Sequence, residues 1–517
     1  MKNLRHSRAQ KRIILVLVVV IAGAGLFAAS KHLCSNPPFR LLLGAYDFIC
    51  TYYIETLDLV MDVSLAEQTI DCTTTLSIRP EKNSRAYLSF VLADNFAIES
   101  ALLNGTPAKV WRLWLLNIIR IPQGQRHQPL ELTLTYRGQP QSTFLSIDPG
   151  FMSLKGAALL TNDLWLPHMT RKAPGEVDST YTIKVPQGYQ IATAGRPGKT
   201  SAEGGKTAQR WENTNLASIL IEPFTVTGHA GSKDFRIFTP PQYAHLGPKI
   251  ARLADEIVHN YEMRLGAIEP RNINIAFSEG SVSGFYIGGL ITIPTNRLEQ
   301  FAAVIDLPGS SAYEDFYHLL THELGHMWWQ NAGDNVSELI GIQWFSEGIT
   351  EFASLWLTGE KLGRHVYMER LNRGVERIRR EENLRAIDQY AYWEHSPIPY
   401  YKGAMMLESL RLQEGIGPVF EFLADMSQLP KGPKTPEMAA EIALRVFGRD
   451  YTAFFQHWIS GAKPLALRVA DHNIEDKNVQ LTVVSSQAAE LPLEIAVVYK
   501  EEMALKHFPL SVYLFSP

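Results

Sequence analysis

The 517-residue sequence predicts an α+β protein of several domains. Apolar residues alternate with period two from about residue 50 to 230, recur with helical spacing from 235 to 465, and return to period two from 466 to 517. Hydrophobic residues make up 46% and charged residues 20% of the chain, which excludes disordered and low-complexity proteins. At roughly 100–200 residues per domain, the length fits about three domains with cores of their own.

The charge balance argues against nucleic acid as a partner. Lysine and arginine together number 49, aspartate and glutamate 53, and the net charge is −4. Binding to a phosphate backbone usually requires a basic excess, which this chain lacks. The three cysteines, Cys34, Cys50 and Cys72, are too few for a disulfide framework or a cysteine-rich metal site.

The N-terminus predicts a membrane segment. Residues 1–12 form a basic tail without an acid, and residues 13–30 carry no charge. A helix of that length spans about 27 Å, close to the hydrocarbon thickness of a bilayer. A cleavable signal peptide remains the alternative, with Ala28-Ala29-Ser30 as its cleavage site; a buried soluble helix fits less well. A single-pass anchor or a signal peptide would both place the rest of the chain outside the cytoplasm, in a periplasmic or extracellular location.

Residues 50–230 are expected to form an antiparallel β domain, a sandwich or saddle. Strand-like segments include TTTLSIRP, LELTLTY and STYTIKVP, and Asn104-Gly105 predicts a tight hairpin turn. The stretch from Gly228 to Lys233 marks the expected boundary. Residues 235–465 follow as a mainly helical domain, and residues 466–517 as a small β segment.

The segment His322-Glu323-Leu324-Gly325-His326 carries the chemistry. On a helix, His322 and His326 lie one turn apart on the same face, so both can reach one ion. Glu323 projects toward the open coordination position, where it can deprotonate water. Ser311 to Glu314 matches a capping box and predicts the start of this helix.

A downstream helical segment, Trp344-Phe345-Ser346-Glu347-Gly348, supplies a third ligand. Two imidazoles and the carboxylate of Glu347 leave one position of a tetrahedral Zn²⁺ open, which is the catalytic arrangement. Glu351, one turn further, is expected either to hydrogen-bond a zinc-binding histidine or to be an exposed helical charge. Three histidines on one straight helix cannot all bind one ion, so His318 is expected to support the site or to pack nearby.

These two motifs resemble the zinc signature of the aminopeptidase N and leukotriene hydrolase family of gluzincin metallopeptidases. The family typically reads H-E-L-A-H-Q-W-F-G-N and then W-L-N-E-G. Twenty residues, Met327 to Ser346, separate the second histidine from the glutamate here, where the family usually has eighteen. The resemblance covers residues 50–465 and implies a thermolysin-like catalytic domain after the β domain. Residues 466–517 would be a reduced version of the family's small sandwich.

A second motif, Pro399-Tyr400-Tyr401-Lys402-Gly403, is similar to the family's P-Y-E-K-G. The resemblance implies that the Tyr400 hydroxyl stabilises the oxyanion of the tetrahedral intermediate; a phenol is suitable because it donates a hydrogen bond without ionising near neutral pH. A core aromatic is the alternative. Tyr401, in the position of the family's glutamate, receives no role.

A third motif, residues 283–292, is similar to the family's G-A-M-E-N-W-G-L-I-T only in part. Its Gly-Leu-Ile-Thr end is kept, which implies a substrate-binding strand and a place for Tyr286, Gly288 and Gly289 beside the peptide. The family's glutamate, which binds the free amine of the substrate, is replaced by Tyr286. Glu279, seven residues earlier, is the nearest acid.

We therefore expect a membrane-anchored zinc metallopeptidase that acts on peptides or proteins with reduced dependence on a free N-terminus. His322, His326 and Glu347 would hold one zinc ion per chain, and Glu323 and Tyr400 would be catalytic. Two alternatives stay open from the sequence. One is a zinc-bearing binding module without catalysis, and the other is a hydrolase of a small non-peptide electrophile.

Overall fold

The computed structural model describes most of the chain after residue 51. The described residues are 52–80, 86–141, 150–160, 163–169, 177–213, 218–231, 233–267, 269, 272–281, 284–329, 341–382, 384–390, 396–430, 432–462, 467–475, 478–485, 493–499 and 502–508. Among them, no helix has the length and apolarity needed to cross a bilayer. The predicted membrane segment at 13–30, Cys34 and Cys50 lie outside the described residues. The chain forms two compact units, residues 1–263 with 267–339 and residues 264–266 with 340–517.

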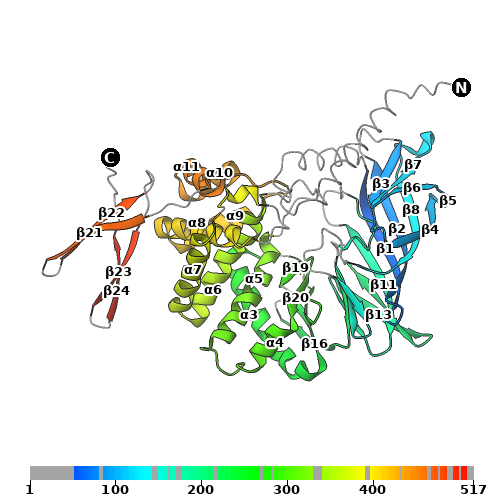
Figure 1. Cartoon of the computed structure of the whole chain (residues 1–517), viewed down its shortest axis with the longest axis horizontal. Helices are drawn as coiled ribbons and strands as arrows, with labels where there is room; N and C mark the ends of the chain where they lie inside the picture. The colour runs from blue at the N-terminus through cyan, green and yellow to red at the C-terminus, as the bar shows by residue number, and fades with distance from the viewer. Residues whose placement is uncertain are drawn as a thin grey trace. The chain divides into compact units, whose positions relative to one another are not determined.

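The first unit begins with an eight-stranded sheet (Figure 1). Its strands, in spatial order, are β13 (Arg196–Glu203), β14 (Lys206–Glu212), β11 (Asp178–Pro186), β1 (Tyr52–Ser64), β2 (Thr69–Pro80), β8 (Leu130–Gly138), β4 (Phe96–Leu103) and β5 (Thr106–Pro107). All pairs are antiparallel except β1 with β11, which is parallel. The β domain expected from the sequence is confirmed, and the parallel pair is the departure from it.

The turn predicted at Asn104-Gly105 is confirmed. Leu103 of β4 pairs with Thr106 of β5, so the turn has two residues. Asn104 has a φ of 51° and Gly105 of 73°. Positive φ at both positions is typical of the type I′ turn that suits the twist of a hairpin.

Two smaller sheets complete the β domain. One has the order β12 (Gln190–Thr193), β15 (Ile219–Glu222), β10 (Gly156–Leu159) and β9 (Phe151–Ser153), and the other the order β3 (Tyr87–Val91), β7 (Leu116–Arg120) and β6 (Val110–Leu113). Side chains from all three sheets share one hydrophobic core, in which Trp165, Trp211 and Phe90 are fully buried. Burial of this apolar surface stabilises the domain.

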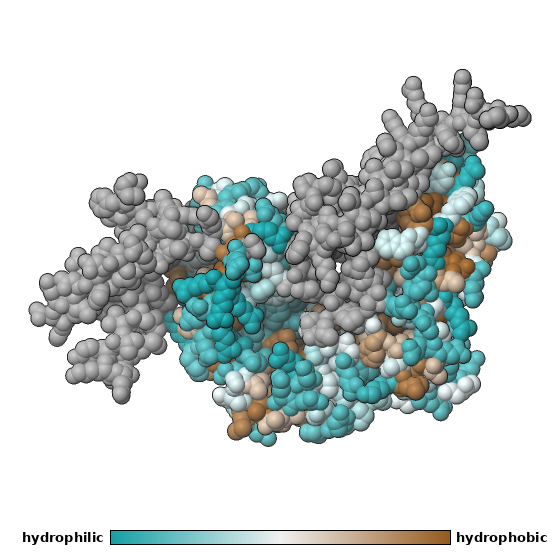
Figure 2. Space-filling model, in the orientation of Figure 1, coloured by the Kyte–Doolittle hydropathy of each residue, from teal (hydrophilic) through white to brown (hydrophobic). Residues whose placement is uncertain are grey.

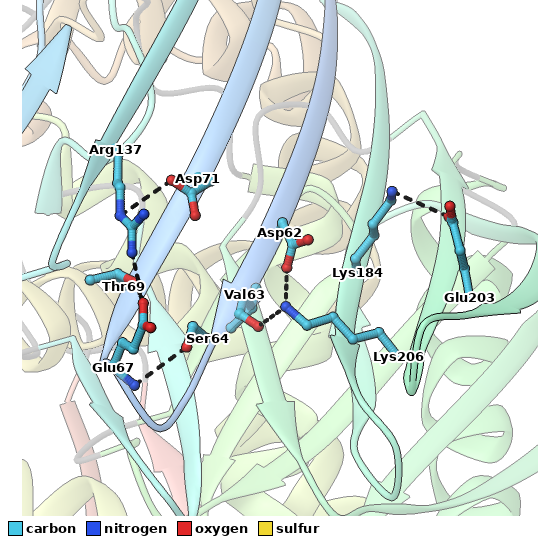
Figure 3. Close-up of polar contacts among 10 residues, drawn as sticks. All are labelled: Asp62, Val63, Ser64, Glu67, Thr69, Asp71, Arg137, Lys184, Glu203 and Lys206. Carbon is cyan, nitrogen blue, oxygen red and sulfur yellow. Dashed lines mark hydrogen bonds and ion pairs between the residues drawn. The ribbon is translucent and has the colours of Figure 1, made fainter. Parts of the chain in front are cut away.

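The solvent side of the large sheet carries ion pairs, drawn in Figure 3. Lys206 contacts Asp62, and Arg137 Nη2 lies 2.7 Å from Glu67 Oε2. The Glu67 backbone N–H also donates to Ser64 Oγ at 3.3 Å, which tightens the turn between β1 and β2. Exposed pairs of this kind contribute little to stability, so the core dominates.

Hydrophilic side chains cover most of the described surface on the face shown in Figure 2, and the hydrophobic ones form small separate areas. Exposed aromatics include Trp111 on β6, with 43% of its surface exposed, and Trp114 in the turn that follows, with 51%. Most large apolar side chains of the first unit are therefore in its interior.

The first unit continues with a five-stranded sheet and three helices. The strand order is β16 (Thr225–Ala230), β17 (Asp234–Thr239), β18 (Asn272–Ser278), β20 (Leu290–Pro294) and β19 (Phe285–Ile287). The helices are α3 (Gly247–Leu265), α4 (Thr295–Ala302) and α5 (Ser311–Trp329), and a 3₁₀ segment, η4 (Pro241–Leu246), precedes α3. Because β16 and β17 form a hairpin across Gly231, the chain changes sheet a few residues before the predicted boundary at Gly228 to Lys233.

The second unit is helical and ends in strands (Figure 1). Its helical elements are the π-helical turn η6 (Trp344–Gly348), α6 (Ile349–Leu362), α7 (Arg364–Arg379), the 3₁₀ segment η7 (Ile387–Gln389), α8 (Ile398–Glu414), α9 (Ile416–Ser427), α10 (Pro436–Phe447), α11 (Thr452–Phe455) and the π-helical turn η9 (Gln456–Ser460). Two hairpins follow, β21 (Leu467–Glu475) with β22 (Asn478–Ser485) and β23 (Leu493–Tyr499) with β24 (Glu502–Phe508). These strands lie within residues 466–517, where the sequence predicts a small β segment.

Candidate metal centre and active site

Helix α5 carries the His-Glu-x-x-His segment and begins at Ser311. The cap is Ser310, whose Oγ accepts a hydrogen bond from the Tyr313 N–H at 3.4 Å. Ser310 O also accepts the Glu314 N–H at 3.0 Å. The predicted capping box was therefore one residue out of register, because the serine before Ser311 supplies the side chain that satisfies the first helical N–H groups.

Contacts with α3 fix the segment in place. The Tyr261 hydroxyl donates to Thr321 O at 3.1 Å, and the Tyr261 ring stacks on Trp328 with centroids 5.0 Å apart. Tyr261 is fully buried, so this contact joins the interiors of the two helices. The residues on either side of the two histidines are thereby held, and the histidines keep a fixed geometry.

The three polar side chains of the motif are buried. His322 is 7% exposed, Glu323 4% and His326 8%. The two imidazole rings lie 4.8 Å apart between centroids and are nearly perpendicular, at 85°. Their spacing on one helical face is the one that the sequence predicts.

Glu347 completes a group of potential ligands. It lies in the π-helical turn η6 just before α6 and is 5% exposed. One ligand atom each from His322, His326 and Glu347 lie within 4.8 Å of one another. Two imidazole nitrogens and one carboxylate oxygen are a donor set that suits Zn²⁺ with an open position, so the residues fit the metal. π-Helical turns are rare and often occur at functional sites.

His318 is not a member of this group among the described residues. Its ring centroid is 6.3 Å from that of His322, one turn earlier on α5. The side chain is half-buried. The expectation that His318 does not bind the metal agrees with this placement.

Glu351 is buried in α6, with 5% of its surface exposed. The alternative of an exposed helical charge is therefore wrong. The pKa of the Tyr401 phenol is raised, mainly by burial and to a smaller extent by the negative charge of Glu351.

Two motif glycines meet in the second unit. A Cβ built on Gly403 of α8 would lie 2.6 Å from the Cα of Gly348, and one on Gly348 would lie 2.9 Å from the Cα of Gly403. Backbone therefore packs directly on backbone where the segment after Glu347 meets the helix that bears Tyr400. The sequence contained a signal for this contact, because both motifs end in glycine, but it did not show that the two glycines touch.

Tyr400 and Tyr401 lie in the first turn of α8 and are half-buried. The Tyr401 hydroxyl accepts a hydrogen bond from Arg377 Nη1 at 3.1 Å, and the guanidinium lies 5.4 Å from the ring centroid. Gly374 of α7 leaves the space that this ring fills, since a Cβ there would be 2.4 Å from Tyr401 Cδ1. Tyr401 therefore joins α7 to α8.

Lys402, the next residue of the motif, is 2% exposed. Its Nζ donates to the backbone carbonyl of Gly461, at the end of the described helical region. Burial lowers the pKa of its ammonium to about 8, against the opposing effect of Asp388. No role was predicted for Lys402 from the sequence, and in the structure it anchors residue 461 to α8.

Gly284 lies against the proposed catalytic base within the first unit. A Cβ at this position would be 2.5 Å from Glu323 Oε1 and 3.0 Å from Leu319 Cδ1. Tyr286 follows on β19, at the edge of the five-stranded sheet, and is 6% exposed. Residues 284–287 and α5 are thus neighbours.

Gly288 and Gly289 form the turn that joins β19 to β20. Their φ angles are 56° and 100°, which favour glycine, and Ile287 pairs with Leu290 across them. The Asn274 N–H donates to Gly289 O at 2.8 Å. These glycines therefore have a structural role in the turn, and their predicted contact with substrate stays a prediction.

Glu279 is 61% exposed in its side chain, and Lys155 Nζ lies 3.8 Å from its Oε2. Next to it the structure shows an acid that the sequence did not single out. Glu222, at the end of β15, is 6% exposed and accepts a hydrogen bond from Ser278 Oγ. Burial raises the pKa of its carboxyl to about 7, although hydrogen bonds from Ser278 and from the backbone of Glu279 oppose this shift.

The sequence matches no protein-family model, and no curated protein is significantly similar to it. Solved structures do match. An M1 zinc metallopeptidase from Deinococcus radiodurans aligns with a TM-score of 0.65 and 16% identity, over 80% of this chain and 95% of that one. Legionella pneumophila aminopeptidase A, in complex with aspartic acid, aligns with a TM-score of 0.65 and 16% identity, over 89% of this chain and 56% of that one. The chain therefore has the fold of these M1 zinc metallopeptidases.

Proposed function

We propose that this chain is a zinc-dependent metallopeptidase. The observation that carries the proposal is the buried group of His322, His326 and Glu347, whose ligand atoms lie within 4.8 Å of one another. Isolated buried charges are costly, and a buried carboxylate beside two imidazoles is the kind of group that a cation compensates. The fold shared with M1 zinc metallopeptidases supports the same function.

The metal would be held by the two histidines of α5 and by Glu347 of η6. Bound zinc supplies a Lewis acid that lowers the pKa of water near neutrality and polarises a carbonyl. His326 and His322 are fixed by the packing of α5, and Glu347 by the close contact of Gly348 with Gly403. A fixed ligand set of this kind favours the open coordination that hydrolysis requires.

Glu323 would be the general base. It accepts a proton from the attacking water and then donates it to the amine that leaves when the peptide bond breaks. Its carboxylate is buried and lies against Gly284, where the absence of a side chain leaves room for it. Tyr400 would donate a hydrogen bond to the oxyanion, a role for which its half-buried position on α8 is suitable.

Substrate would bind along β19 as an added strand. β19 is the last strand of its sheet, so one of its edges has no neighbouring strand among the described residues. An extended peptide can pair with such an edge through backbone hydrogen bonds, which give affinity without demanding a particular sequence. This supports a peptide or protein substrate.

We also propose that the enzyme depends weakly on a free N-terminus. Tyr286 stands where the resembling family has its amine-binding glutamate, and a neutral phenol supplies no full negative charge. Glu279, the nearest acid in sequence, is exposed beside Lys155. Blocked peptides and internal bonds would then be cut nearly as well as free N-terminal ones.

The location is a separate proposal that rests on the sequence. The basic residues of 1–12 and the uncharged run of 13–30 support an anchor with residues 31–517 outside the cytoplasm. A protease added to intact cells or spheroplasts should then degrade the catalytic region. Full protection in cells whose outer surface is accessible would contradict it.

Digestion of a peptide library by the purified full-length chain tests the function directly. We expect cleavage that a chelator abolishes and that added zinc restores, with cleavage sites read by mass spectrometry. A preparation that contains zinc but cuts no peptide in the library would contradict the proposal.

A further inference from the structure

We infer that Glu222 is a positioning residue, which holds the turn of residues 278–281 and through it the edge strand β19. The inference deepens the proposed function, since it names a residue that would control substrate binding at β19. It starts from geometry within the first unit. Glu222 ends β15 of the four-stranded sheet, whereas Ser278 ends β18 of the five-stranded sheet.

The carboxylate of Glu222 is surrounded by donors from the turn. Ser278 Oγ donates to Glu222 Oε1, and the backbone groups of Glu279 and Gly280 also form hydrogen bonds with the carboxylate. Hydrogen bonds to an ionised acceptor are roughly twice as strong as neutral ones. A carboxylate that is 6% exposed and accepts from three successive residues is suited to holding them in place rather than to binding a ligand.

The space around this carboxylate is restricted. A Cβ on Gly156 of β10 would lie 2.8 Å from Glu222 Cγ, and one on Gly280 would lie 1.7 Å from Cε1 of the Phe151 ring. The absence of a side chain at Gly156 therefore leaves room for the Glu222 side chain within its own sheet, and the absence of one at Gly280 lets the turn lie directly on the four-stranded sheet. The contact is a close fit between two sheets, with Glu222 at its polar centre.

A second contact connects the turn of residues 278–281 to β19. Ser281 Oγ and Thr292 Oγ1 lie 3.1 Å apart, both buried. Thr292 of β20 pairs with Phe285 of β19, the residue before Tyr286. The turn is thus fixed to Glu222 at one end and to the β19–β20 hairpin at the other, so a shift of the turn moves the strand that would pair with substrate.

Protonation should weaken this arrangement. The pKa of the Glu222 carboxyl is about 7, raised mainly by burial, so the carboxylate gains a proton as the pH falls below neutrality. The charged group that acts on it is Glu279, which raises the pKa further and is itself paired with Lys155. The hydrogen bonds from Ser278, Glu279 and Gly280 lower this pKa, so by linkage they bind the carboxylate more strongly than the neutral carboxyl. Protonation therefore relieves the cost of burying the charge but weakens the hold of Glu222 on the turn, and through the turn on β19.

The first test is hydrogen exchange of the full-length protein at pH 8, which does not depend on catalysis. Glu222→Gln should accelerate exchange of the amides in residues 279–281 and 285–292 by about tenfold. Glu279→Gln is the matched control, because it removes an exposed neighbouring charge and should leave this exchange within twofold of the parent. Unchanged exchange in Glu222→Gln would overturn the inference whether or not the chain is a peptidase.

The second test is kinetic. Glu222→Gln should raise KM at pH 8 by about tenfold for a free peptide and equally for its N-acetylated twin, with kcat within twofold and zinc content unchanged. The KM of the parent should also rise between pH 8 and pH 6, and this rise should be absent from Glu222→Gln. In Glu279→Gln that rise should persist at a slightly lower pH, because one of the charges that raise the pKa of Glu222 is gone. A KM increase confined to the free peptide would show instead that Glu222 binds the substrate amine, and the inference would be wrong.

Discussion

Helix α5 and strand β19 are neighbours in the first unit, yet their sequences determine their chemistry to very different degrees. In α5, two histidines and a glutamate within five residues fix which side chains share a face. In β19, three residues pair with β20. The turn of the hairpin accepts a hydrogen bond from Asn274, and the preceding turn of residues 278–281 is held by Glu222 and Thr292. A site built on a helix can be read from local spacing, whereas a site built on an edge strand depends on contacts of long sequence separation.

The largest effect should come from α5. Glu323→Gln would remove the proposed base and keep the proposed metal ligands, so we expect kcat/KM to fall by about a thousandfold or more while zinc content stays at the level of the parent. Steady-state kinetics with metal analysis of the same samples checks this. His318→Ala, one turn away and outside the ligand group, should retain most activity. Equal losses of activity in Glu323→Gln and His318→Ala would contradict the assignment of Glu323 as the base.

The second effect concerns how Glu347 is held. Gly403→Ala places a Cβ 2.6 Å from the Cα of Gly348, so backbone must move. We expect a loss of about 1–3 kcal/mol in the free energy of unfolding, together with weaker zinc binding, measured by denaturation and metal titration. Gly417→Ala is the control, because a Cβ there would meet no atom within 4 Å beyond its chain neighbours and the backbone of its own helix. A Gly403→Ala protein as stable as the control would contradict the backbone contact.

The effect expected at β19 is smaller and concerns specificity for a free N-terminus. A charge-assisted contact with a substrate amine is worth about 1.5–3 kcal/mol, or roughly ten- to a hundredfold. Under the proposal that Tyr286 stands in place of the amine-binding acid, N-acetylation of a peptide should lower kcat/KM by less than about tenfold. Paired peptides with and without the acetyl group give the ratio. A hundredfold loss would show that a carboxylate from another part of the chain binds the amine.

Lys402 should change the pH dependence of stability, and only at alkaline pH. Its folded-state pKa is about 8 against an ordinary 10.5, so between these values the folded chain binds fewer protons than the unfolded chain. The free energy of unfolding should therefore rise with pH across this window, by roughly 3 kcal/mol at most. Denaturation of the parent and of Lys402→Met from pH 7.5 to 10 tests this, and the rise should be absent from the variant. Lys361→Met, at an exposed position of α6, should behave as the parent does.

Several features were predicted from sequence because their causes are local. The type I′ turn at Asn104-Gly105, the start of the helix near residue 311 and the placement of His322 and His326 on one face of it follow from residue type and spacing. The cap at Ser310 was missed by one residue, because two adjacent serines offer the same hydroxyl. Both serines can cap, and only the backbone geometry selects between them.

Other features required the fold. The parallel pairing of β1 with β11 joins residues more than a hundred positions apart, and nothing in either strand's alternation specifies it. The contact of Gly348 with Gly403 and the burial of Glu222 beneath the 278–281 turn are of the same kind. Glu222 in particular looked like an ordinary acid in a strand, and its pKa near 7 results from burial that the sequence could not reveal.

The measurement that tests the central claim most directly is the zinc content of three purified full-length proteins. The parent should hold about one zinc ion per chain, since the described residues offer one three-residue ligand group. Glu347→Ala should lose most of the metal, and His318→Ala should keep it. If Glu347→Ala binds zinc as tightly as the parent while His318→Ala releases it, the assignment of His322, His326 and Glu347 as the ligand set is wrong.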